Sequence, residues 1–311
     1  KVELLMSNTG SFFCAADDNE FCEVKLVLDS IFGPNNFVAA PVWQKVFAKK
    51  NKALISVSHD YIPCFVKNLV KWDRSLIPRT TEQIGAFKNP DNDPRGPWQS
   101  VSFTVQSEDA VKRQAYRFPI TIPNGEIVLP PTGRHWNGLP DRYEELVKDN
   151  RIWFGPDGAN APRIKVFLSE VQEGIVPDTW WPHDEFGNNQ EAKKEILALF
   201  GASEPFNTPK PIKLLKRIIT IATKNQNRNI ILDYFAGSGT TAHAALTLNK
   251  EDQGNRKYIL VEMAGYFDTV LKPRIQKVMY SSEWKDGQPQ NTDGISHMFK
   301  YLTLEQYEDT L

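Results

Sequence analysis

The residues best suited to chemistry stand together after the apolar run 230–232. Asp233 and Phe235 lead into the pair Gly237 and Gly239, and helix-forming residues follow. Glycines let a backbone approach a ligand closely and take φ angles that a side chain would penalise. Main-chain amides at the start of the following helix can then face an anionic or hydroxyl-bearing group. This succession of strand, tight turn and helix predicts a site for an adenosine-containing cofactor.

A second candidate, Glu262, ends the next predicted strand, 258–262. In nucleotide-binding folds, an acidic side chain at this place accepts hydrogen bonds from the ribose hydroxyls. The alternative is a surface glutamate at the end of a strand. The nearby glycine pair favours ribose binding.

A third set precedes the glycine pair. Phe206, Thr208 and Lys210 lie just before the segment 212–223, whose apolar residues recur at helical spacing. Pro211 suits the first turn of that helix, where its missing N–H costs no hydrogen bond. The segment is therefore a helix start, whether or not its side chains also contact a ligand.

Acidic residues follow another predicted strand, 12–16. Asp17 and Asp18 open a helix that ends at 33–34, and carboxylates favour a helix N-terminus. Loops after the strands of an open α/β sheet are also where ligands bind. We therefore expect Asp17 and Asp18 to border the substrate pocket. His59 and Asp60 are interpreted as structural, because neighbours in an extended segment point to opposite faces.

The elements that must position these residues alternate between strands and helices. Extended segments are predicted at 12–16, 37–40, 55–58, 61–66, 230–233 and 258–262. Helices are predicted from 21 to 32, over 212–223, from the glycine pair through 248, and around 267–278. The predicted fold class is α/β, with a Rossmann-like sheet that carries an inserted, loop-rich region.

Four stretches differ in composition. We expect 1–69 to form the substrate-side half of the α/β domain and 206–281 its cofactor-binding half. Prolines, tryptophans and turn dipeptides crowd 70–205, which favours short strands joined by ordered loops. This stretch is interpreted as a recognition insert. The tail, 282–311, is predicted to form a hairpin and then to begin a helix at 304–307.

Charge and composition set further limits. The net charge of −1 over 311 residues does not by itself indicate a nucleic-acid partner, but the distribution of charge matters more than the sum. Basic residues cluster at Lys45, Lys49, Lys50 and Lys52, and at Lys213, Lys216, Arg217, Lys224 and Arg228. Such clusters are commonly solvated faces and are also suited to phosphate contacts.

The cysteines and histidines do not predict a metal centre. Cys14, Cys22 and Cys64 lack metal-ligand spacing and are interpreted as buried thiols in a reducing cytoplasm. The five histidines are scattered. No apolar stretch approaches the roughly 18 residues of a membrane span, and the first residues do not resemble a secretory signal. The first residue is not methionine, which is compatible with a piece of a longer chain.

The motif at Asp233, Phe235, Gly237, Gly239 and Thr240 resembles the cofactor loop of amino-group DNA methyltransferases. In that family a segment with threonine, variable, lysine and proline lines the cofactor pocket, and this chain has it at 208–211. The order of motifs, with a recognition insert before the cofactor motifs, is similar to that of the modification subunits of type III restriction–modification systems. These are β-class methyltransferases that make N6-methyladenine in DNA.

The resemblance implies S-adenosylmethionine as cofactor. The implied cofactor-binding residues are Asp233, Phe235, Ala236, Gly237, Ser238, Gly239, Thr240, Glu262, Phe206, Thr208 and Lys210. The implied contacts with substrate and DNA are Asp17, Asp18, Arg95, Trp98, Lys49 and Lys50. Double-stranded DNA, a restriction subunit with helicase and nuclease activity, and a second copy of the chain are the implied partners. No membrane partner is implied.

One departure affects the catalytic expectation. The family holds the target amino group with an Asp-Pro-Pro-Tyr loop, and this sequence contains none. By family order the loop would precede Lys1, so the chain is interpreted as a fragment with no identifiable catalytic residue. An N4-cytosine methyltransferase, a nicotinamide oxidoreductase and a non-catalytic DNA-binding module remain alternatives. The oxidoreductase expects a third glycine where Ala242 stands, although alanine is tolerated there.

Overall fold

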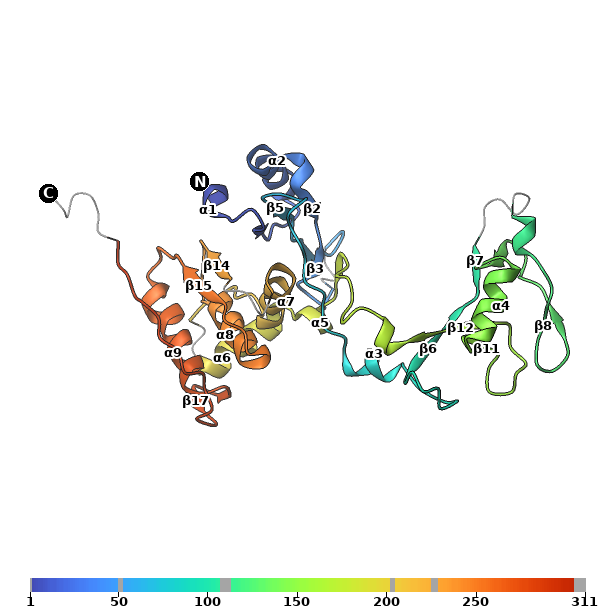
Figure 1. The fold of residues 1–311 in the computed structure, drawn as a ribbon. Helices are drawn as coiled ribbons and strands as arrows, with labels where there is room; N and C mark the ends of the chain where they lie inside the picture. The colour runs from blue at the N-terminus through green and yellow to red at the C-terminus, as the bar shows by residue number, and fades with distance from the viewer. Residues whose placement is uncertain (1, 50–52, 107–112, 202–204, 225–228, 305–311) are drawn as a thin grey trace. The chain divides into compact units, whose positions relative to one another are not determined.

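The computed structural model describes residues 2–49, 53–106, 113–201, 205–224 and 229–304. The chain divides into two compact units (Figure 1). Lys1–Ile77 and Val176–Leu311 form one, called here the α/β unit. Pro78–Ile175 form the other, called the inserted unit because it interrupts the first in sequence.

The N-terminal part of the α/β unit contains two small sheets. Its elements are α1 (Val2–Leu5), β1 (Ser11–Phe13), α2 (Phe21–Phe32), η1 (Pro34–Asn36), β2 (Phe37–Ala39), β3 (Val42–Gln44), β4 (His59–Tyr61) and β5 (Cys64–Val66). One sheet has the order β1-β5-β2 and is antiparallel. The other has the order β13-β3-β4, with β13 (Trp180–Trp181) supplied from beyond the inserted unit. Leu28 and Phe32 of α2 pack on Phe65 to form the core beside the first sheet.

The C-terminal part is built around a parallel strand pair. Its elements are α5 (His183–Phe186), α6 (Asn189–Phe200), α7 (Ile212–Ala222), β14 (Ile230–Asp233), α8 (Thr240–Asp252), β15 (Lys257–Leu260), the π-helical turn η4 (Phe267–Leu271), α9 (Lys272–Tyr280), β16 (Trp284–Lys285) and β17 (Gln288–Pro289). Strands β14 and β15 are parallel and joined through α8. The glycine turn therefore lies between a strand end and a helix start, as the sequence predicts.

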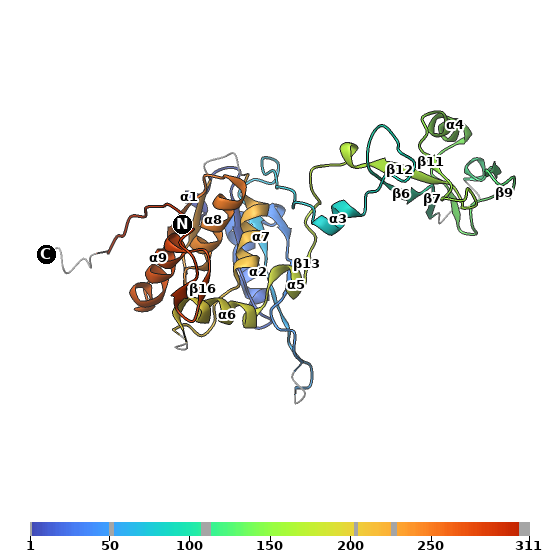
Figure 2. The same ribbon diagram turned by 90° about the horizontal axis from the view of Figure 1, so that it is seen from below.

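Helix α8 is buried against α7 and α9 (Figure 2). Its small residues Ala242, Ala244 and Ala245 are fully buried, and small side chains let neighbouring helices approach closely. Leu271 and Ile275 close the core on the α9 side.

In its described residues, the inserted unit has short strands, two α-helices, two 3-10 helices and ordered turns. Its elements are α3 (Thr81–Gly85), β6 (Trp98–Ser102), β7 (Thr104–Gln106), η2 (Gln114–Tyr116), β8 (Ile120–Thr121), β9 (Ile127–Val128), β10 (Arg134–Trp136), α4 (Pro140–Lys148), β11 (Ile152–Trp153), β12 (Arg163–Phe167) and η3 (Leu168–Glu170). The strands pair as β11-β12-β6, β10-β7 and β8-β9. Phe103, Trp136 and Leu146 lie in its core.

Some expectations need correction. The strand predicted at 55–58 is irregular, and the extended pairing begins at His59, in β4. Cys22 is exposed and Cys14 partly so, which leaves only Cys64 as a buried thiol. Burial raises the pKa of Cys64 to about 12. Of the helix start predicted at 304–307, residues 305–307 lie outside the described residues. None of the helices in the described part of the chain has the length and apolar character needed to cross a membrane.

Candidate active site

The glycine turn is shaped by two residues with positive φ. Gly237 has φ +54° and Gly239 has φ +78°, values that favour glycine over residues with a Cβ. Gly239 is also the N-cap of α8. The Ala236 amide donates to the Val261 carbonyl at 3.1 Å, which ties the turn to the end of the next strand. The strand ends and the helix start thus meet at one place.

Glu262 faces this turn. Its Oε2 accepts a hydrogen bond from the Gly237 amide at 2.9 Å. Its Oε1 accepts from the amides of Met263 and Ala264 at 2.9 and 3.0 Å. Although burial opposes ionisation, these amide donors hold the pKa of Glu262 below its ordinary value. A carboxylate that stays charged beside Gly237 is suited to accept hydrogen bonds from ligand hydroxyls.

Two aromatic side chains border the turn. A methyl group at Gly237 would lie 3.2 Å from Cζ of Phe206. Phe206 meets Tyr266 edge to face, with ring centroids 5.0 Å apart. Phe235, by contrast, is 83% exposed. Phe206 therefore lies next to Gly237, while the Phe235 ring is exposed; the expected cofactor contacts of both residues stay predictions.

Three of the implied cofactor residues turn their side chains inward. The Asp233 carboxylate accepts hydrogen bonds from the Phe235 amide at 3.2 Å and from the Thr241 hydroxyl at 2.5 Å. Ser238 and Thr240 are 3% and 5% exposed. These side chains are used within the fold, so a ligand beside them would meet main-chain groups.

A cavity of about 570 Å³ joins residues from five separate segments of the α/β unit. It is lined by Ala15, Ala16, Asp17, Glu20, Val24, Lys45, Asp60, Asn189, Thr208 and Lys210. It thus brings together two segments that the sequence singles out separately, the one with Asp17 and the one with Thr208 and Lys210.

Asp60 is the buried charge of this cavity, in keeping with its structural interpretation from sequence, which did not identify its partners. It is 6% exposed and accepts from Lys45 Nζ at 2.6 Å and from Lys210 Nζ at 2.9 Å. Burial opposes its ionisation, but Lys210 and Lys45 outweigh burial and lower the pKa of Asp60. The signal available in the sequence was an aspartate inside an extended segment, which requires a cationic partner when buried.

The remaining implied substrate contacts in the α/β unit lie at the surface. Asp18 is exposed, with Oδ1 3.8 Å from Nε2 of His59. Lys49 is also exposed, and Lys50 lies outside the described residues. The described members of the second basic cluster are ion-paired: Lys213 with Glu191, Lys216 with Glu251, Arg217 with Glu185, and Lys224 with Asp73. Arg228 lies outside the described residues.

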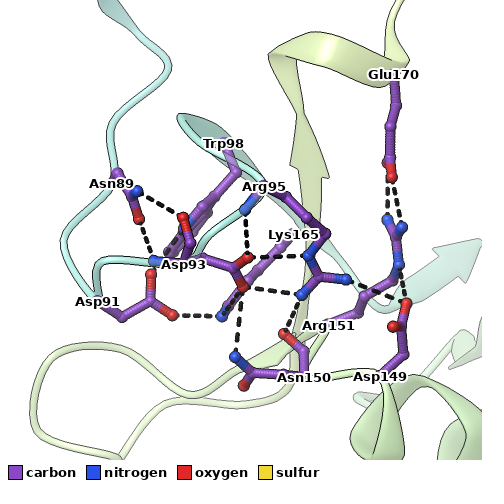
Figure 3. Close-up of polar contacts among 10 residues, drawn as sticks. All are labelled: Asn89, Asp91, Asp93, Arg95, Trp98, Asp149, Asn150, Arg151, Lys165 and Glu170. Atoms are coloured by element: carbon purple, nitrogen blue, oxygen red, sulfur yellow. Dashed lines mark hydrogen bonds and ion pairs between the residues drawn. The ribbon is translucent and has the colours of Figure 1, made fainter.

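Arg95 and Trp98 belong to a polar network inside the inserted unit (Figure 3). The Arg95 guanidinium makes a bidentate pair with Asp93, with Nε 2.9 Å from Oδ1 and Nη2 2.8 Å from Oδ2. Trp98 is 4% exposed and its indole N–H donates to Asp91 at 2.9 Å. The Trp98 ring is therefore packed within its own unit, and its expected contact with DNA stays a prediction. Arg95 is likewise engaged by carboxylates of its own unit.

Lys165 completes the network. Its ammonium group is 1% exposed and pairs with Asp91 and Asp93. The Asp93 side chain has no exposed surface, and its hydrogen bonds from Arg95 hold its pKa far below the ordinary value. Within the described residues, no group of three or more His, Cys, Asp or Glu side chains is arranged to hold a metal ion.

Comparison with known proteins shows the family. Residues 1–272 match the family model described as DNA methylase, N6_N4_Mtase. The chain therefore belongs to the N6/N4 DNA methylase family, and the resemblance to amino-group DNA methyltransferases is confirmed.

The individual relatives are modification enzymes. The chain is 35% identical to the type III restriction-modification enzyme StyLTI Mod subunit of Salmonella typhimurium, over 97% of this chain and 47% of that protein. It is 26% identical to the EcoP15I Mod subunit of Escherichia coli, over 83% of this chain and 44% of that protein. The chain thus spans about half the length of these relatives.

A solved structure, the complex of M1.HpyAVI with SAM, is similar over 88% of this chain and 77% of that chain. The sequence identity is 14% and the TM-score is 0.37.

Proposed function

We propose that this chain forms the cofactor-binding and target-recognition part of a DNA adenine-N6 methyltransferase of the type III modification kind, with S-adenosylmethionine as its cofactor. The observation that carries the proposal is the pairing of the Gly237 amide with the Glu262 carboxylate at 2.9 Å. This hydrogen bond joins the glycine turn, whose space a side chain at Gly237 would fill, to the Glu262 carboxylate, which stays ionised. The Rossmann-like character of the sheet rests on the same β14–α8–β15 unit.

The residues present fit this cofactor. The absence of a Cβ at Gly237 leaves room beside Phe206, and the exposed Phe235 ring offers an apolar face. Glu262 would hold the ribose hydroxyls, and the main chain of 237–240 would face the polar end of the molecule. When bound, S-adenosylmethionine supplies an electrophilic methyl group.

The cavity at Asp17 is proposed to receive the target nucleotide. Asp60 fixes Lys45 and Lys210 at its wall, so two donors keep defined positions there, and Asp17 adds an acceptor. Fixed polar groups orient a bound base without the cost of reorganising at the moment of reaction. The inserted unit is proposed to contact the duplex. A restriction subunit and a second copy of the chain are proposed partners, and the cytoplasm the proposed location.

Adenine is favoured over cytosine because the relatives with type III names cover most of this chain. The sequence contains no Asp-Pro-Pro-Tyr loop. We therefore expect the chain to bind S-adenosylmethionine without transferring the methyl group by itself.

Isothermal titration calorimetry tests the cofactor assignment. The chain is titrated separately with S-adenosylmethionine and with NAD. Glu262→Ala is expected to weaken S-adenosylmethionine binding by about tenfold or more, since it removes a charged acceptor. Glu283→Ala, at an exposed glutamate of the same unit, serves as the matched control and should bind as the unchanged chain does. Binding of NAD without S-adenosylmethionine would overturn the proposal.

A further inference from the structure

A buried cation lies beneath the glycine turn. Arg274 of α9 has 0% exposure. Its Nη1 donates to the hydroxyls of Ser238 at 3.0 Å and Thr240 at 2.8 Å, and its Nε lies 3.3 Å from Nδ1 of His243. One guanidinium therefore holds both hydroxyl side chains of the turn and the first part of α8.

The same guanidinium faces a carboxylate, Glu195, that holds the start of α7. Glu195 of α6 is 18% exposed, and its Oε2 lies 3.8 Å from Nη2 of Arg274. Its two oxygens accept from the Ile212 amide at 3.2 and 3.1 Å. Ile212 is the first residue of α7, directly after the segment with Phe206, Thr208 and Lys210. Glu195 therefore caps the helix that follows this segment.

We propose that Arg274 and Glu195 are positioning residues of the cofactor pocket, which fix the glycine turn and the start of α7 relative to each other. The inference rests on the proposed function, because it concerns the pocket assigned to S-adenosylmethionine. Neither side chain needs to touch the cofactor. Arg274 holds the hydroxyl side chains of Ser238 and Thr240, and Glu195 holds the main-chain amide of Ile212.

The charges around Glu195 give the pair a pH dependence. Burial raises the pKa of Glu195 to about 7, assisted by Glu191 and opposed by Arg274, the Ile212 amide and Lys213. Burial also lowers the pKa of Arg274 to about 10, so it stays cationic at neutral pH. His243, buried beside Arg274, has a pKa well below its ordinary value and is neutral. Below pH 7 protonation of Glu195 therefore leaves the Arg274 charge without its partner.

The test compares Arg274→Met, Arg274→Lys and Glu195→Gln with a control at a second buried arginine. Arg256 is 4% exposed and pairs with Asp252 at 2.8 Å, at the opposite end of α8 from the glycine turn. Arg256→Met thus removes another buried arginine and its ion pair, away from the glycine turn. Two quantities are measured: the S-adenosylmethionine dissociation constant from pH 6 to pH 8, and the hydrogen–deuterium exchange of the ligand-free chain.

Arg274→Met is expected to raise the dissociation constant about tenfold or more at pH 8, with partial recovery in Arg274→Lys and no change in Arg256→Met. The difference in affinity between the unchanged chain and Glu195→Gln should shrink as the pH falls from 8 to 6. Exchange should speed up at both 237–241 and 212–216 in Arg274→Met, but at neither segment in Arg256→Met.

Faster exchange at only one of the two segments would overturn the inference, because the pair would then not couple them. Equal effects of Arg274→Met and Arg256→Met on affinity would overturn it too, because Arg274 would then contribute only to the overall stability of the fold. If the unchanged chain binds no S-adenosylmethionine while Arg274→Met still speeds exchange in both segments, the proposed function fails and the coupling stands.

Discussion

At the scale of single residues, the chemistry of the glycine turn divides between side chains and main chain. Gly237 and Glu262 could be identified from sequence because their roles follow from position after a strand. The inward orientation of Ser238 and Thr240 could not, since it depends on Arg274, a residue more than thirty positions away. Asp60 was interpreted as structural, but its partners Lys45 and Lys210 could not be identified because they lie far from it in sequence.

Gly237→Ala tests the space at the turn. The new methyl group would lie 3.2 Å from Phe206 at a φ of +54°, which costs about 1 kcal/mol in strain and pushes the ring aside. S-adenosylmethionine affinity is expected to fall about tenfold in calorimetry. Gly133→Ala places a methyl group at a φ of +74° with nothing within 4 Å and should leave affinity unaltered. Unimpaired binding by Gly237→Ala would show that the cofactor does not need this turn.

The lowered pKa of Glu262 predicts acid sensitivity. A carboxyl with a folded pKa below its ordinary 4.5 stabilises the fold above that value and loses this contribution as pH falls below it. The difference in thermal midpoint between the unchanged chain and Glu262→Gln should therefore be largest near neutral pH and shrink below pH 4.5. A difference that grows on acidification would contradict the amide contacts described.

At the scale of elements, helices flanking the turn were predicted and those of the proline-rich stretch were not. Helix α6 has ordinary signals: Asn188 accepts from the Glu191 amide at 2.9 Å as N-cap, and Gly201 ends the helix. The surrounding prolines and tryptophans favoured loops instead. Helix α6 and strand β13 belong to the α/β unit. Tertiary packing sets their place in that unit, and amino-acid composition does not reveal it. The assignment of recognition to 70–205 stays a prediction.

The network of Figure 3 holds the inserted unit together at β6 and β12. Asp93→Asn is expected to lower its free energy of unfolding by about 3 kcal/mol, because Lys165 and Arg95 lose a buried partner. Denaturant unfolding followed by tryptophan fluorescence measures this, with the exposed Asp157→Asn as control. Since the pKa of Asp93 is depressed, the difference should persist at pH 5 and diminish only in stronger acid. Equal stability of the two variants would show that the network contributes nothing net.

At the scale of the whole molecule, the two units separate the proposed tasks. The glycine turn, Glu262, Arg274 and the Asp17 cavity all lie outside 78–175. Replacing 78–175 by a flexible Gly/Ser linker of about twenty residues should leave S-adenosylmethionine affinity within about threefold of the unchanged chain and abolish duplex binding in gel-shift assays. Loss of cofactor binding would mean that the α/β unit requires the inserted unit to fold.

The pairing of Lys213, Lys216, Arg217 and Lys224 with carboxylates affects how DNA binding depends on ionic strength. Cations already neutralised by their own chain displace few counterions when a polyanion arrives. On a double-logarithmic plot of the duplex association constant against sodium chloride concentration, these four cations should therefore add little to the slope.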